Sequence, residues 1–319
     1  MVEPAAEVEP VETTTAFWHR LGLPGLFDVH VHFLPEPVER KVWAQFDLAG
    51  PKIGREWPIR YRGTIDERVE RLRGLGVRRF SALPYAHRPG IAGYLNDWAR
   101  GFADDVPECL RSATFYPEPE AAAYVADLVE AGVEVFKVHV QVGEFHLDDP
   151  LLDEVWGTLE DAGTPIVVHA GSGPIGNAFT GPDPLRRVLR RHPRLTAIVA
   201  HLGAPEYAEF LALAETYERV HLDTTMVFTD FFDHEGPFPR QHLPRLVELQ
   251  DRVLLGSDFP TIPYPYLHQL ESLERLGLGD DWLRRVCWYN ASALFAETRT
   301  GSSREVRPSA DRPRDLRPS

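Results

Sequence analysis

The feature of this sequence that most constrains its fold is a repeated alternation of two kinds of segment. Short apolar runs alternate with longer segments in which apolar residues recur at helical spacing. This alternation is typical of βαβ units, in which helices join parallel strands and cover the sheet. The apolar runs lie at 27–33, 78–85, 111–116, 133–140, 165–170, 195–201, 220–225 and 253–257. The helical segments lie at 66–76, 90–104, 119–131, 150–162, 183–191, 206–218, 240–250, 267–277 and 280–296.

The number of repeats predicts how the sheet closes. Eight parallel strands, each followed by a helix, close into a (β/α)8 TIM barrel, whose active sites lie at the C-terminal ends of the strands. An open doubly wound sheet usually has a Gly-rich turn after its first strand. Here the first run is followed by His32-Phe33-Leu34-Pro35 instead. We therefore predict an α/β fold of the barrel type.

Segments outside the repeat set the predicted domain limits. Residues 1–16 combine acidic residues, prolines and a run of Thr without an apolar period, and predict a disordered leader. Residues 297–319 are rich in Arg, Ser and Pro and predict a disordered tail. The barrel domain is expected over 17–296. Residues 34–64 form a long insertion after the first strand, rich in aromatic and basic residues, which would lie over the catalytic end of a barrel.

Composition and charge exclude several classes of function. A net charge of −14 offers no basic face for phosphates, so we expect no nucleic-acid partner. No apolar run approaches the roughly 20 residues that cross a bilayer, and the N-terminus does not resemble a signal peptide. With only Cys109 and Cys287, we expect no disulfide framework and a cytoplasmic location. The expected partner is a small-molecule substrate.

Four histidines and an aspartate fall at the C-terminal ends of predicted strands. His30 and His32 alternate along the first strand and therefore point to the same face. His169 ends the fifth strand, His201 ends the sixth, and Asp258 follows the eighth. Imidazoles and a carboxylate that converge in this way can hold a divalent ion, which lowers the pKa of a water molecule toward neutrality. Asp258 can accept a proton from that water, and His201 can shuttle protons or polarise a carbonyl.

Five short motifs occur together between residues 26 and 296. They are Asp28-Val29-His30-Val31-His32, Val167-Val168-His169-Ala170-Gly171, Ala200-His201-Leu202-Gly203, Gly256-Ser257-Asp258-Phe259-Pro260 and Tyr289-Asn290-Ala291-Ser292-Ala293-Leu294-Phe295. The set resembles amidohydrolase family 2, the branch of the amidohydrolase superfamily that contains aminocarboxymuconate-semialdehyde decarboxylase.

The resemblance implies a distorted TIM barrel with one divalent ion, often zinc and sometimes manganese. His30, His32, His169 and Asp258 match the ligand positions of the family. His201 matches a histidine with acid–base or substrate-polarising roles. Members hydrolyse C–O, C–N or C–C bonds or remove carboxylate from unsaturated and aromatic acids, and many are homodimers.

Lys137 and His139 end the fourth predicted strand on one face. Binuclear members of the superfamily place a carboxylated lysine there that bridges two ions, whereas a lysine of the mononuclear branch contacts substrate or packs in the barrel mouth. The mononuclear branch is the better match, so we predict Lys137 and His139 as substrate-binding residues. For His139, an inner-barrel hydrogen-bonding role is the equal alternative. We interpret the remaining histidines, His87 and His146 among them, as loop or surface residues, except that His221 begins the seventh strand at the end opposite the catalytic one.

These observations predict a metal-dependent hydrolase that acts on a small cyclic or carboxylated substrate through a metal-activated water. A non-oxidative decarboxylase of an unsaturated or aromatic acid is the alternative, because both reactions need the same ion. A barrel that has lost catalysis and serves as a binding module is disfavoured by the intact ligand set and His201. Aromatic residues after the seventh and eighth strands, together with Trp43 and Trp57 of the insertion, indicate an apolar pocket for a planar or cyclic substrate.

Overall fold

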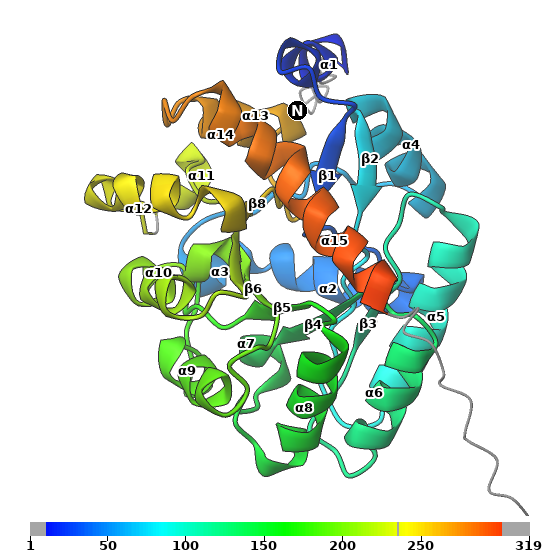
Figure 1. Ribbon diagram of the computed structural model, residues 1–319. Helices are drawn as coiled ribbons and strands as arrows, with labels where there is room; N and C mark the ends of the chain where they lie inside the picture. Colours follow the sequence, from blue (N-terminus) through cyan, green and yellow to red (C-terminus); the bar gives the residue numbers. More distant parts are fainter. Residues whose placement is uncertain (1–10, 235, 302–319) are drawn as a thin grey trace, which may run out of the picture.

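A computed structural model of the chain describes residues 11–234 and 236–301. Short parallel strands lie at the centre and helices surround them (Figure 1). The strands are β1 (Leu26–Asp28), β2 (Val77–Phe80), β3 (Ser112–Thr114), β4 (Val135–His139), β5 (Ile166–His169), β6 (Ala197–Val199), β7 (Val220–Asp223) and β8 (Val253–Leu254).

Each strand is followed by at least one helix, as the repeat predicts. The helices that cover the strands are α4 (Ile65–Leu75), α5 (Ala92–Asp105), α6 (Ala121–Glu130), α8 (Asp153–Ala162), α9 (Pro182–Arg191), α10 (Tyr207–Thr216), α12 (Leu243–Glu248) and α13 (Tyr266–Glu274). The others are α1 (Val11–Arg20), α2 (Glu36–Phe46), α3 (Ala49–Ile53), α7 (Val140–Gly143), α11 (Asp230–Asp233), α14 (Asp280–Arg284) and α15 (Asn290–Gly301).

The strands form two hydrogen-bonded sheets, one of β1 and β2 and one of β3 to β8 in sequence order, all parallel. Isolated bridges join the two sheets on both sides. One connects Phe80 to Cys109, and the other connects Val31 to Phe259. The ring of strands therefore runs from β1 to β8 with two narrow seams. This arrangement confirms the predicted TIM barrel and locates its distortion at the seams.

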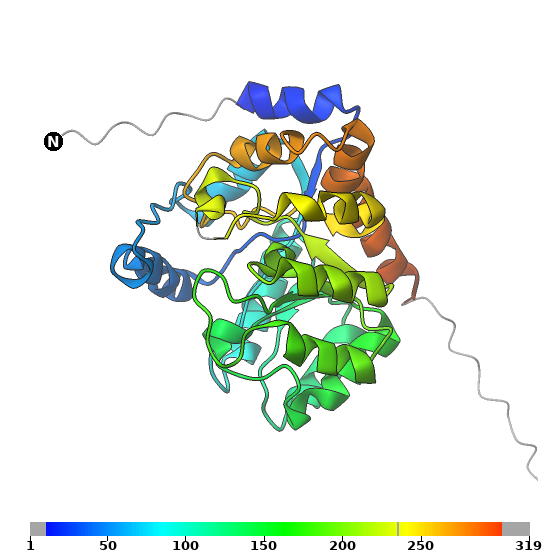
Figure 2. The same cartoon turned by 90° about the vertical axis from the view of Figure 1, so that its left-hand side faces the viewer.

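Alternate residues of the strands pack inside the barrel. Phe27, Val135, Val167, Ile198 and Leu254 form one buried apolar cluster with side chains of α15. Helix α15 thus closes the end of the barrel at which the strands begin. Figure 2 shows α15 on the opposite side of the molecule from α2 and α3. The polar side chains at the C-terminal ends of the strands lie between this apolar plug and the insertion.

The strands are shorter than predicted. β1 ends at Asp28 and β6 at Val199, so His30, His32 and His201 lie just beyond strands rather than on them. The segments after these strands remain buried in the barrel mouth. Their apolar character therefore continues past the last paired residue, and hydrophobicity alone does not mark where strand pairing stops.

Helix α1 corrects the predicted leader. Residues 11–16, which we expected to be disordered, belong to this helix. Phe17 and Trp18 are buried, and the helix packs against α4 and α13. The run of Thr has low intrinsic helix propensity, which made the segment look unstructured, and tertiary packing outweighs that propensity.

The C-terminal limit is also corrected, because α15 runs to Gly301 rather than ending at 296. The rest of the predicted leader and tail, residues 1–10 and 302–319, lies outside the described residues. Within the part of the chain that the structure describes, no helix combines the length and apolar character needed to cross a membrane.

The long insertion after β1 contains α2 and α3, which project from one end of the barrel (Figure 2). Its last part is fixed to the segments after β7 and β8. The indole Nε1 of Trp57 donates a hydrogen bond of 2.7 Å to the Thr261 carbonyl. The guanidinium of Arg55 lies 3.8 Å from the centre of the Phe231 ring. These contacts hold the insertion over the barrel mouth, where the sequence predicted it.

A buried ion pair fixes the beginning of the insertion. Arg68 of α4 donates two hydrogen bonds to the Glu39 carboxylate of α2, one of them 2.7 Å long between Nη2 and Oε2. Both side chains are almost fully buried. The guanidinium also lies 5.3 Å from the Phe33 ring and 5.2 Å from the Trp43 ring. The pair therefore couples the position of α2 to the barrel.

We expect Arg68→Met to lower the free energy of unfolding by about 3 kcal/mol, because it leaves the buried Glu39 carboxylate without its partner. Urea unfolding followed by circular dichroism measures the change. The double variant Glu39→Gln/Arg68→Met should recover part of the loss, since it contains no uncompensated buried charge. Wild-type stability of the single variant would contradict the coupling.

Candidate metal centre

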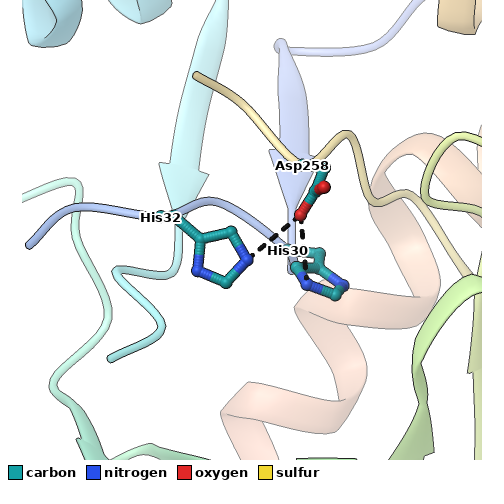
Figure 3. A group of neighbouring side chains, drawn as sticks. All are labelled: His30, His32 and Asp258. Atoms are coloured by element: carbon teal, nitrogen blue, oxygen red, sulfur yellow. Dashed lines mark ion pairs between the residues drawn. The ribbon is translucent and has the colours of Figure 1, made fainter. Parts of the chain in front are cut away.

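Three side chains converge at the mouth of the barrel (Figure 3). His30 and His32 come from the segment after β1, and Asp258 comes from the segment after β8. Their ligand atoms all lie within 4.8 Å of one another. Asp258 Oδ1 is 3.1 Å from His32 Nε2 and 3.5 Å from His30 Nε2. Two ligands at metal-bond distance from one tetrahedral ion are about 3.4 Å apart, so this spacing fits a common ion.

The hydrogen bonds of the two imidazoles direct one nitrogen of each toward the centre. His32 Nδ1 donates to the Leu83 carbonyl at 2.8 Å, because a carbonyl can only accept. His30 Nδ1 donates to the Asp223 carboxylate at 2.8 Å. Burial, followed by the charge of Lys137, lowers the pKa of His30 to about 3 and keeps it neutral. The Nε2 atoms of both rings therefore face the Asp258 carboxylate, and these donor types suit a divalent metal ion.

The carboxylate of Asp223, at the end of β7, orients the His30 ring through the Nδ1 atom of that ring. Besides the His30 imidazole, its carboxylate accepts hydrogen bonds from the backbone N–H groups of His201 at 2.8 Å and Thr225 at 3.1 Å. Burial raises the pKa of this carboxyl, but its electrostatic interaction and hydrogen bond with the His30 imidazole outweigh burial and hold the pKa well below its usual range. Asp223 is not among the site residues predicted from the sequence, although it lies near the C-terminal end of the seventh predicted strand.

We expect Asp223→Asn to weaken metal binding by about 10- to 100-fold, because the amide replaces the charged acceptor that orients the His30 ring. Competition with a chelator of known affinity measures the change. Asp233→Asn, which alters an exposed carboxylate of α11, is the matched control. Equal metal affinity in both variants would contradict the positioning role of Asp223.

The backbone at the centre is tightly constrained. His201 and Asp258 adopt left-handed φ values of 54° and 73°, which cost L-residues of order 1–3 kcal/mol and concentrate at functional sites. The Asp258 N–H donates to the His30 carbonyl at 2.9 Å and fixes the aspartate beside the histidines. Gly256 permits this close approach. A Cβ at Gly256 would lie 2.1 Å from Thr225 Oγ1 and 2.9 Å from His30 Cβ.

His201 lies next to the group of three. The centre of its ring is 5.2 Å from that of His30, and it lines the same pocket. Its Nδ1 donates to the Thr225 carbonyl at 3.0 Å, which leaves Nε2 as the nitrogen that can accept a proton. Burial lowers the pKa of His201. The ring is therefore neutral and oriented for proton transfer.

His169 stands apart from the three converging residues. Its ring stacks on His139 with 3.8 Å between centres, because the two residues are direct neighbours in the register of β4 and β5. Its Nε2 lies 3.3 Å from the Gly173 carbonyl. It borders the centre through His201, with 4.7 Å between ring centres. The role of His169 as a fourth ligand therefore stays a prediction.

Lys137 reaches the centre from β4. Its side chain is fully buried, and its Nζ lies 3.0 Å from His30 Nε2. Burial lowers the pKa of this ammonium to about 8, against the opposing effect of the Asp223 and Asp258 carboxylates. Lys137 and His139 both line the pocket. This placement is compatible with the predicted substrate contacts, which themselves stay a prediction.

The converging side chains line a pocket of about 650 Å³, a volume typical of small-molecule sites. Its apolar wall comes mainly from the insertion, including Trp43, Phe46 and Trp57. The expectation that aromatic residues after the seventh and eighth strands form this wall is mostly wrong. Of these aromatic residues only Phe232 lines the pocket, whereas Phe228, Phe231, Phe259, Tyr264 and Tyr266 pack in the surrounding core.

The loop after β2 contributes residues that the sequence analysis did not assign to the site. Tyr85 lies edge-on to His32, with 5.5 Å between ring centres. His87 and Arg88 follow it and also line the pocket. The predicted role of His87 as a plain loop residue is therefore corrected. Its position after the second predicted strand was the one signal in the sequence that could have placed it at the barrel mouth. Its proximity to His30 and His32 depends on closure of the barrel, which a local pattern does not show.

The family follows from a comparison of sequences. A sequence model of the family described as amidohydrolase matches residues 27–296. The chain therefore belongs to the amidohydrolase family, whose members are metal-dependent enzymes. This result confirms the resemblance drawn from the five motifs. No curated protein sequence matches the chain.

Solved structures share the fold at low sequence identity. An uncharacterised TIM-barrel protein from Bordetella bronchiseptica is 18% identical with a TM-score of 0.69, over 86% of this chain and 99% of that one. A probable 2-pyrone-4,6-dicarboxylic acid hydrolase from Acinetobacter baumannii is 14% identical with a TM-score of 0.59, over 85% and 99%. A 5-carboxyvanillate decarboxylase from Novosphingobium aromaticivorans is 13% identical with a TM-score of 0.60, over 86% and 98%.

Proposed function

We propose that this chain is a metal-dependent hydrolase that acts on a small cyclic or carboxylated organic molecule. The convergence of His30 Nε2, His32 Nε2 and Asp258 Oδ1 beside a pocket of substrate size carries this proposal. His169 is the fourth proposed ligand. Zinc is the proposed ion, with manganese as the alternative, because nitrogen and carboxylate donors suit both. Such an ion supplies Lewis-acid chemistry, polarising a substrate oxygen or activating water.

Asp258 and His201 are the proposed proton-transfer residues. Burial raises the pKa of the Asp258 carboxyl, but the hydrogen bond and charge of His32 outweigh it and hold the pKa below its usual range. Asp258 is therefore ionised, and the oxygen that does not face the histidines can accept a proton from water. His201 can accept a proton at Nε2 and return it to the leaving group. Lys137 and His139 are proposed to bind substrate from β4.

Non-oxidative decarboxylation of an unsaturated or aromatic acid is the alternative function. The observation that favours it is the buried Lys137 ammonium beside His30, which would draw a substrate carboxylate to the centre. The decarboxylase from Novosphingobium aromaticivorans that shares this fold was crystallised with manganese. The two reactions differ in whether water attacks the substrate or carbon dioxide leaves it.

Metal analysis of protein purified without added metal, followed by assays with esters, lactones and aromatic acids, tests the proposal. About one zinc ion per chain, with hydrolysis that stops on chelation and returns on zinc addition, is the expected result. Release of carbon dioxide without hydrolysis would favour the decarboxylase. Two ions per chain would favour a bridging Lys137. Failure to bind any supplied divalent metal would overturn both functions.

A further inference from the structure

The outer part of the pocket carries a cluster of basic side chains that the proposed chemistry does not use. Lys41 lies on α2 of the insertion, and His87 and Arg88 lie in the loop after β2. All three line the pocket. We name Lys41, His87 and Arg88 the basic rim. It joins two segments far apart in the sequence, which the fold brings to the same side of the barrel mouth.

The basic rim has no counter-charge. Within residues 11–234 and 236–301, Lys41, His87 and Arg88 make no hydrogen bond or ion pair between side chains. The other cations that line the pocket do have partners. Lys52 donates to Gln45 at 2.5 Å, and Lys137 lies 3.0 Å from His30.

The carboxylates that line the pocket do not neutralise the rim. Glu39 is paired with Arg68, Asp258 belongs to the metal centre, and Glu144 forms no ion pair with a described residue. Burial lowers the pKa of His87, and the charges of Arg88 and Lys41 lower it further, with no carboxylate acting against them. The three side chains are exposed and border the pocket. In a chain with 48 acidic and 34 basic residues, an uncompensated cluster of cations along the edge of a pocket is not explained by composition.

The position of the rim relative to the metal centre sets the size of the molecule that would reach both. Tyr85 contacts His32, and His87 follows two residues later. Two residues of extended chain span at most about 7 Å. The backbone of the rim loop therefore lies close to the metal centre, and the shared pocket of about 650 Å³ has room for a six-membered ring with substituents. Trp43 and Phe46 provide apolar surface in the same pocket, against which a ring can pack.

We infer that Lys41, Arg88 and His87 bind an oxyanion of the substrate, a carboxylate or a phosphoryl group, at the end remote from the metal centre. Lys41 and Arg88 supply charge, and neutral His87 supplies one further hydrogen-bond donor. This inference rests on the proposed function, because the molecule that carries the oxyanion is the substrate of the proposed hydrolase. It narrows the substrate class to small cyclic compounds that carry an anionic group opposite the reacting bond.

Calorimetric titration of the full chain with three probes tests this inference. Isophthalate carries two carboxylates, 3-carbamoylbenzoate has one of them replaced by a neutral amide, and 3-phosphonobenzoate carries a phosphoryl group instead. The wild-type protein should bind isophthalate about tenfold more tightly than 3-carbamoylbenzoate, since one charge-assisted interaction is lost in the amide. Tighter binding of 3-phosphonobenzoate than of isophthalate would identify the oxyanion as phosphoryl, and the reverse order as carboxylate.

Variants of the rim locate the effect. Lys41→Met and Arg88→Met should each weaken isophthalate binding about tenfold, and the double variant should not distinguish isophthalate from 3-carbamoylbenzoate. Arg40→Met is the matched control. It removes the same charge from the neighbouring exposed position of α2, where Arg40 pairs with Glu36 outside the pocket, and should change binding less than about twofold.

Titrations before and after removal of metal separate this inference from the proposed function. The weaker probe binding of the Lys41→Met and Arg88→Met variants should also be observed in the metal-free protein. If the rim variants weaken probe binding but no substrate is turned over, the oxyanion site is supported and only the hydrolase is overturned. Turnover of neutral esters with unchanged probe binding in the rim variants would overturn the oxyanion site and leave the hydrolase. Absence of measurable binding of all three probes at millimolar concentration would also overturn the oxyanion site.

Discussion

Alanine in place of His30 and His32 together should reduce the metal content from about one ion per chain to about a tenth of that value or less. Turnover should fall by at least about 10³-fold, because the change removes two of the three atoms that converge on one point and with them the Lewis acid. Mass spectrometric metal analysis and the hydrolysis assay on the same preparation measure both effects.

A matched double variant shows whether the loss of metal and turnover comes from the loss of metal ligands or from the removal of any two histidines. His19→Ala/His234→Ala removes two exposed histidines that lie outside the pocket and should keep full metal content and turnover. Circular dichroism and the thermal midpoint of both double variants show whether the fold survives. If the His30/His32 variant remains folded and retains its metal, the proposed centre is wrong.

Substitution of His201 by asparagine should lower kcat by about 10²- to 10⁴-fold while the metal content stays at the wild-type value. The variant removes the nitrogen that accepts and donates the proton but keeps the backbone shape. Asparagine is among the residues that best tolerate a left-handed conformation, and His201 has φ of 54°. Steady-state kinetics, metal analysis and unfolding on one preparation measure the three properties.

The control for this variant is His146→Asn, which makes the same change at an exposed position. It should leave kcat, metal content and stability unchanged. Loss of metal in His201→Asn would indicate a structural or ligand role instead of proton transfer. Unchanged turnover in a metal-loaded His201→Asn protein would remove His201 from the mechanism.

The architecture of this protein was predictable from local patterns in the sequence. Each of the eight strands and the helices that follow them lies within or next to a predicted segment, because alternating apolar runs and helical periods are encoded over 5 to 15 residues at a time. The convergence of His30, His32 and Asp258 was also predictable. Each follows the C-terminal end of a strand, and barrel topology places these ends in one mouth.

Features that depend on neighbours distant in the sequence were missed or only partly predicted. The ends of β1 and β6 are decided by where partner strands stop pairing, which leaves His30 and His201 beyond the strands. The sequence also did not predict that His169 stacks on His139 of the adjacent strand and is not among the three converging residues. The aromatic residues after β7 and β8 were expected in the pocket but mostly pack in the core, since the insertion already occupies that wall.

The type and order of the elements, the family and the candidate metal ligands could be predicted from the sequence alone, because they depend on short segments and their spacing. Which polar groups lie beside one another, by contrast, depends on the folded arrangement of distant segments. Asp223 behind His30, the Glu39–Arg68 pair and the basic rim each join segments that are between 29 and 193 residues apart or belong to different loops. Such contacts arise from closure of the barrel and packing of the insertion, which no local pattern encodes.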